Sequence, residues 1–175
     1  AVDAVREVII AAPDDTRERL GALACAKPVR FAPAAATPAT TVHDALKQSE
    51  SGLLVTTADH PLLTPGMVRH FLRKIDPNVI SAAAACVDAP TYLAAYPGTR
   101  RTFIRLSDMS FSGANLFWFK KDAAEPLLLF WRRLESKRKN PASMAAAIGL
   151  DVLLLFAVGR MSSPRLIRTI AKRTG

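Results

Sequence analysis

The chain has 175 residues, of which 50% are hydrophobic and 22% are charged, so it can bury the core of one domain and is not generally disordered. Its formal net charge of +9 is concentrated at one end: residues 1–119 carry 12 Lys and Arg against 11 Asp and Glu, whereas residues 120–175 carry 12 against 4. This excess favours an anionic partner, such as nucleic acid, an acidic membrane surface or a phosphorylated small molecule.

The first third of the chain alternates between short apolar runs and segments with helical spacing. A continuous apolar run at 52–57 has the composition of a central strand that is covered on both faces. Asp14 and Asp15 are suitable N-caps for a helix, and Lys27-Pro28 ends it. The pattern predicts strands at 5–12, 29–31 and 52–57, helices at 15–26 and 42–49, and a Pro/Ala/Thr-rich loop at 32–41.

Thr64 and Pro65 predict the start of the next helix, because a hydroxyl caps the helix and proline suits its first turn. Further strands are expected at 79–87, 102–106 and 116–119, followed from residue 122 by helical segments that are interrupted at Pro141, Gly149 and 162–164. This alternation indicates an α/β fold with a mostly parallel sheet flanked by helices. We expect an α/β domain at 1–120 and a basic, all-helical extension packed on it at 121–175.

The cysteines and the apolar runs point to a cytoplasmic protein. Cys25 and Cys86 form no disulfide framework and have no zinc-ligand spacing with the three histidines. Their Ala-rich surroundings predict that both are buried. The longest apolar run, 150–158, is shorter than the roughly 20 residues that span a bilayer, and no signal peptide is recognised.

A carboxylate, Asp59, directly follows the strongest predicted strand. Ligands of open α/β sheets bind beyond the carboxyl ends of the strands, and a carboxylate there suits a Mg²⁺ ion that bridges phosphate oxygens. An Asp after a strand is also a common turn former and helix cap. His60 either orients this carboxylate or is an ordinary loop histidine.

Three stretches resemble segments of one known family. TTADHPLLTP at 56–65 resembles the metal-binding segment of the MobA-like NTP transferases, TPATTVHDAL at 37–46 their element beside the nucleotide base, and FSGANLFW at 111–118 their small-residue turn and strand on the side of the second substrate. The resemblance spans residues 1–120. It implies a Rossmann-like, glycosyltransferase-A-like α/β fold and a nucleotidyltransferase that uses Mg²⁺ and an NTP.

The resemblance also implies roles for individual residues. Asp59 would be the catalytic residue that coordinates Mg²⁺, while the others would bind substrates: Thr40, Thr41 and Val42 near the base or ribose, Gly113 by allowing close backbone approach, and Asn115 through its amide. The reaction would be in-line attack of an anionic acceptor on the α-phosphorus, with release of pyrophosphate.

Purely structural roles stay open for the substrate-binding candidates. Thr40 and Thr41 are also adequate helix N-caps. Gly113 is also suited to a positive φ in a turn, and the Asn115 side chain is also able to bond only its own backbone.

Two parts of the family pattern have no counterpart in this sequence. The family begins with a strand and a Gly-rich loop that cradles the triphosphate with backbone N–H groups, and neither is recognised here. We expect an N-terminal segment to precede the printed sequence; the other interpretation is a degenerate relative that does not bind triphosphate in the usual way. A second metal-binding Asp, expected near the C-terminus, is also missing from 165–175.

The basic last third permits several interpretations. The segment 130–140, FWRRLESKRKN, is either a nucleic-acid contact or a solvated helix face whose Phe130, Trp131 and Leu134 pack on the core. Cations around 153–156 and 166–170 would suit an anionic membrane surface, and the same charge would steer a phosphorylated acceptor.

The combined prediction is a nucleotidyltransferase that acts on an NTP and a small-molecule acceptor. Nucleic acid is not expected as a partner, peripheral membrane contact stays open, and the sequence leaves the NTP, the acceptor and the oligomeric state open. The alternative is a non-catalytic anion- or membrane-surface-binding module built on the same fold.

Overall fold

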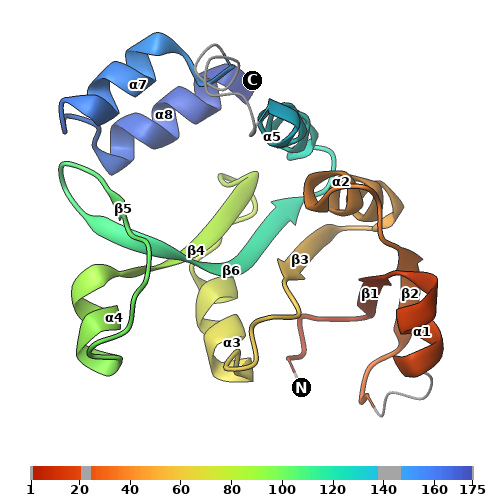
Figure 1. The fold of residues 1–175 in the computed structure, drawn as a ribbon. Coiled ribbons are helices and arrows are strands. Elements are labelled where there is room, and N and C mark those ends of the chain that lie inside the picture. The colour runs from red at the N-terminus through yellow and green to blue at the C-terminus, as the bar shows by residue number, and fades with distance from the viewer. Residues whose placement is uncertain (1, 21–24, 138–146, 175) are drawn as a thin grey trace.

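The computed structural model describes residues 2–20, 25–137 and 147–174. Figure 1 shows the long strand β6 crossing the centre, with α2, α5, α7 and α8 on one side and α3 and α4 on the other. In chain order the elements are β1 (Val8–Ala12), α1 (Asp14–Leu20), β2 (Val29–Pro33), α2 (Pro38–Gln48), β3 (Gly52–Thr56), α3 (Pro65–Arg73), β4 (Ala82–Asp88), α4 (Ala89–Ala95), β5 (Ile104–Arg105), β6 (Ser110–Lys120), α5 (Glu125–Lys137), α7 (Leu150–Ala157) and α8 (Ser163–Thr174).

The strands form two sheets, and the α/β class is confirmed. β1 and β2 are parallel, whereas β6 lies between β3 and β4 and runs antiparallel to both. The larger sheet differs from the mostly parallel sheet that was predicted, since all its strand pairs are antiparallel. The chain enters β6 through a hairpin from β5, closed by a 2.8 Å hydrogen bond from Leu106 N to Met109 O, and not through a helical crossover. β3 and β4 are therefore parallel to each other, and their carboxyl ends lie at the same edge.

Two helices begin with the same capping sequence, a threonine N-cap followed by proline. In α3 the hydroxyl of Thr64 accepts a hydrogen bond from Met67 N and Pro65 is the first helical residue, as the sequence predicts. In α2 the cap is Thr37, so this helix begins at Pro38, within the segment predicted to be a loop. Thr40 and Thr41 consequently lie inside the first turn, and the interpretation of these residues as the N-cap is wrong.

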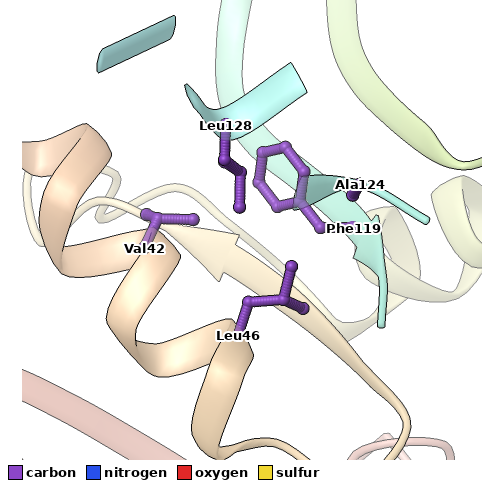
Figure 2. Close-up of a cluster of buried hydrophobic side chains, with 5 residues drawn as sticks. All are labelled: Val42, Leu46, Phe119, Ala124 and Leu128. Atoms are coloured by element: carbon purple, nitrogen blue, oxygen red, sulfur yellow. The ribbon is translucent and has the colours of Figure 1, made fainter. Parts of the chain in front are cut away.

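The main core lies between α2, β6 and α5. Its buried side chains, shown in Figure 2, are Val42, Leu46, Phe119, Ala124 and Leu128. Trp131 on α5 packs against this cluster, with its ring 6.0 Å from Phe117 and 6.4 Å from Phe119. For Trp131 the core-packing interpretation of the basic segment therefore holds, and α5 shares a core with the sheet.

Both cysteines are exposed, so the expectation that they are buried is wrong. Cys86 lies on β4, where side chains alternate between the two faces, and it shares its face with the exposed Ala84 and Asp88. Cys25 lies in the connection to β2. Ala-rich composition predicts small apolar surroundings but gives no information about which strand face is covered.

The other differences concern short elements. The strand expected at 102–106 is reduced to Ile104–Arg105, and the helix Ala89–Ala95 was not expected. In the last third, breaks at Gly149, which has φ +101°, and at 162–164 are confirmed; Pro141 lies outside the described residues. The domain boundary at residue 120 stays a prediction.

Candidate active site

Three of the predicted site residues belong to segments at one edge of the larger sheet. β3 ends at Thr56, which pairs with Leu116 of β6, and β4 ends at Asp88, which pairs with Phe111. The loop that carries Asp59 therefore leaves the sheet beside the stretch of β6 that contains Gly113 and Asn115. The strand register brings the candidate metal ligand and the two candidate acceptor residues to the same edge.

The predicted small-residue turn is in fact a bulge within a continuous strand. Between the pairs Ala84–Phe117 and Cys86–Gly113, β4 contains one residue and β6 contains three. Asn115 sits in this bulge with φ 48°, a left-handed conformation that asparagine tolerates better than most side chains. Bulges are common beside active sites, where they redirect side chains.

The structure rules out the purely structural roles considered above for Gly113 and Asn115. Gly113 does not adopt a positive φ, and a Cβ placed on it would meet no heavy atom within 4 Å. Within the described part of the chain, the side-chain amide of Asn115 makes no hydrogen bond. Packing therefore does not require glycine at 113, and the Asn115 amide is not engaged within the described part of the protein, although the left-handed backbone at 115 favours asparagine.

Asp59 is exposed in the loop between β3 and α3. One of its carboxylate oxygens, Oδ1, accepts a hydrogen bond from the Thr57 hydroxyl, and the other has no partner among the described residues. Because Thr64 caps α3, the interpretation of Asp59 as a helix cap is wrong. The Nδ1 atom of the neighbouring His60 is buried without a hydrogen-bond partner, and no contact joins its ring to the carboxylate in the described residues.

A second carboxylate at this edge, that of Asp88, is already engaged in hydrogen bonds within the protein. Its two oxygens accept hydrogen bonds of 2.9 Å from the backbone N–H and the hydroxyl of Thr91. These bonds, the backbone one foremost, lower the pKa of Asp88 below its ordinary value. Asp88 is thus the cap of α4, which leaves Asp59 as the carboxylate with a free oxygen.

The donor set fits a magnesium ion that arrives with a substrate. Among the described residues no group of three or more His, Cys, Asp or Glu side chains could form a metal cage. Mg²⁺ does not need one, because it is commonly held by one or two carboxylates together with substrate phosphates and water. The free oxygen of Asp59 supplies such a ligand.

The three residues expected near the nucleotide lie in the first turn of α2. The hydroxyl of Thr41 accepts from Ala35 N at 2.9 Å and donates to Thr37 O at 3.1 Å, and the hydroxyl of Thr40 lies 3.1 Å from that of Thr37. The side chain of Val42 is in the core. No hydrogen bond or ion pair in the described part of the chain links them to Asp59, Gly113 or Asn115.

Thr41 also borders a groove of about 300 Å³ between α2 and the β1–β2 sheet. Arg30 of β2 and Asp44, also on α2, line it as well. The hydroxyls and the backbone N–H groups of Thr40 and Thr41 are engaged within the turn itself.

Arg101 is a site residue that the sequence analysis did not identify. Its Nε donates to the hydroxyl of the buried Ser112 at 2.7 Å, its Nη2 donates to Gly113 O at 2.7 Å, and its guanidinium carbon lies 4.9 Å from the centre of the Tyr92 ring. A cation is thereby held beside the bulge. The adjacent Arg100 and Arg101 were visible in the sequence, but only the pairing with β6 distinguishes one from the other.

Comparisons with known proteins give one family match and one fold match. A family model described as "MobA-like NTP transferase domain" matches residues 1–139. A solved structure described as a hypothetical transferase from Thermus thermophilus has the same fold, with a TM-score of 0.75 and 24% identity over 96% of this chain and 87% of that chain. No curated protein matches the chain. None of the helices in the described residues is both long and apolar enough to cross a membrane.

Proposed function

The chain belongs to the MobA-like NTP transferase domain family, and on this premise we propose that it transfers a nucleoside monophosphate from an NTP to a small phosphorylated or otherwise anionic acceptor. The family accounts for the nucleotidyltransferase class and for an NTP as substrate. The observation that supports the finer proposal is the meeting of Asp59, Gly113 and Asn115 at one sheet edge, with the cation of Arg101 beside them.

In the proposed reaction an acceptor oxyanion attacks the α-phosphorus in line with the leaving group. A bond forms between the acceptor oxygen and the α-phosphorus, the bond to the bridging oxygen breaks, and pyrophosphate leaves with that electron pair. Mg²⁺ bound at Asp59 would neutralise charge on the phosphate oxygens. Such a transfer depends on positioning and charge neutralisation more than on covalent chemistry by the protein.

The remaining residues would position the two substrates. Gly113 would let a substrate approach the backbone of β6, and the Asn115 amide would hydrogen-bond the acceptor or the nucleotide. Thr40, Thr41 and Val42 would lie near the base or ribose, with the two threonine hydroxyls engaged in the turn and Val42 in the core.

Pyrophosphate release tests this function directly. We expect the full-length protein to release pyrophosphate from one or more of the four common NTPs when phosphate monoesters of small sugars and alcohols are offered. Removal of divalent metal with EDTA should abolish release, and Mg²⁺ should restore it. The dephosphorylated counterparts of the acceptors are the matched control. Release that is unaffected by EDTA, or that is equal with the dephosphorylated compounds, would contradict the proposal.

Arg101→Ala is expected to weaken binding of the acceptor more than binding of the NTP. Charge-assisted hydrogen bonds contribute about 1.5–3 kcal/mol, so the KM for a phosphorylated acceptor should rise roughly 10- to 100-fold, with little change in the KM for the NTP. Steady-state kinetics with one substrate varied at a time give both constants. Arg100→Ala removes an adjacent exposed arginine and should leave both KM values unchanged; an equal effect of the two variants would remove Arg101 from the acceptor site.

A further inference from the structure

The α7–α8 pair exposes large apolar side chains. Leu154 is 64% exposed, Val158 at the end of α7 is 63% exposed and Ile167 on α8 is 66% exposed. These helices lie beyond residues 1–139, the part that the family model matches. The nucleotidyltransferase proposal therefore does not account for this apolar surface.

Cations accompany these apolar side chains. Residues 147–174 contain one carboxylate, Asp151, which pairs with Arg173 at 3.1 Å. No carboxylate of the described residues pairs with the other four cations of this segment, which are Arg160, Arg165, Arg168 and Lys172. This end of the molecule therefore presents positive charge that the protein does not neutralise.

On α8 the apolar and cationic residues share a single exposed stripe. With 100° per residue, Ile167, Ala171 and Pro164 fall on one half of the exposed arc, and Arg168, Lys172 and Arg165 fall on the other half. α8 rises about 1.5 Å per residue, so Arg165 and Arg168 both lie near its start. An apolar strip edged by arginines is the pattern of a helix that lies in a membrane interface.

The α/β part anchors the start of α8. Asp108, which follows β5, accepts hydrogen bonds from the hydroxyl and the backbone N–H of Ser163 at the start of α8, and these bonds lower the pKa of Asp108 below its ordinary value. Met161 is buried, and its carbonyl accepts from Ser107 N at 2.8 Å. The inner side of the connection is thus anchored, and the stripe on α8 faces outward.

We propose that the exposed stripe of α8, which contains Arg165, Ile167, Arg168 and Lys172, docks on an anionic lipid membrane. The apolar side chains enter the interface while the arginines bind lipid phosphates. A nucleic-acid duplex would use the cations but leave the apolar side chains in water. For that reason the observations favour lipid. The helix lies on the bilayer and does not cross it.

Vesicle co-sedimentation of the full-length protein tests the proposal. We expect binding to vesicles that contain phosphatidylglycerol to exceed binding to pure phosphatidylcholine by about tenfold or more, because several arginines lie near the surface. Ile167→Asp and the double variant Arg165→Gln/Arg168→Gln should each reduce binding about tenfold or more. Pyrophosphate release by both variants should be unchanged, so failure of the docking proposal is distinct from failure of the proposed function.

The matched control is Val79→Asp, which alters an apolar residue that is 78% exposed in the connection between α3 and β4. This variant should bind anionic vesicles like the unaltered protein, and circular dichroism melts should show that all variants fold. Equal binding to neutral vesicles, or a loss with Val79→Asp as large as with Ile167→Asp, would overturn the proposal. Two results with a DNA duplex, found together, would also overturn the proposal: the duplex binds the Ile167→Asp variant as tightly as the unaltered protein, and it displaces the unaltered protein from vesicles.

Discussion

Replacement of Asp59 with asparagine is expected to lower the kcat of pyrophosphate release by about 100-fold or more, the scale seen when one electrostatic group is removed from an active site. Asparagine has nearly the same shape and its oxygen still accepts the hydrogen bond from Thr57. What is lost is the negative charge that would hold Mg²⁺. The measurement is the initial rate as a function of Mg²⁺ concentration.

Asp76→Asn provides the matched control for this substitution. Asp76 is also an exposed aspartate in a connection, where its Oδ1 accepts from Asn78 N at 2.9 Å. If Asp59 were only a turn former, the two variants would behave alike, with small losses of stability and normal turnover. Full activity of Asp59→Asn would remove Asp59 from the mechanism.

Leu128→Ala is expected to cost about 2–5 kcal/mol of unfolding free energy, the range for buried leucines. Leu128 is 0% exposed and belongs to the cluster that joins α5 to α2 and β6. Truncation leaves a cavity where α2 packs on β6 and α5, three elements that hold one another in place, so the site has limited freedom to collapse. Urea unfolding followed by tryptophan fluorescence, to which Trp131 on this cluster contributes together with Trp118, measures the change.

Leu129→Ala is the control for Leu128→Ala. It removes the same atoms from the next position of the same helix, where the side chain is 45% exposed. We expect a loss below about 1 kcal/mol, because exposed sites contribute little. Similar losses for the two variants would contradict the placement of Leu128 in the main core.

Local signals predicted much of the site. The strand at 52–57 leads into Asp59, and Thr64-Pro65 starts α3, because capping and strand composition act over a few residues. The start of α2 was missed although Thr37-Pro38 carries the same signal. In that case the Ala- and Thr-rich composition favoured a loop.

Features that depend on pairing between distant segments were not predictable. The direction of β6 is set by its hairpin with β5, and the left-handed Asn115 exists because β6 has two more residues than β4 between their pairs. Arg101 became a site residue only through its bonds to Ser112 and Gly113. In each case the contact joins two separate segments, and neither segment's own sequence indicates that the two will pair.

The central position of β6 also has a consequence for synthesis of the chain. In the described residues β3 and β4 hydrogen-bond to no strand except β6, so a nascent chain that has not yet exposed residues 110–120 holds both of them with open edges. The parallel β1–β2 pair, by contrast, is complete once residue 33 has emerged. Open strand edges favour aggregation. The larger sheet is therefore most vulnerable while the ribosome still covers β6, and its closure is a single late event that pairs three strands at once.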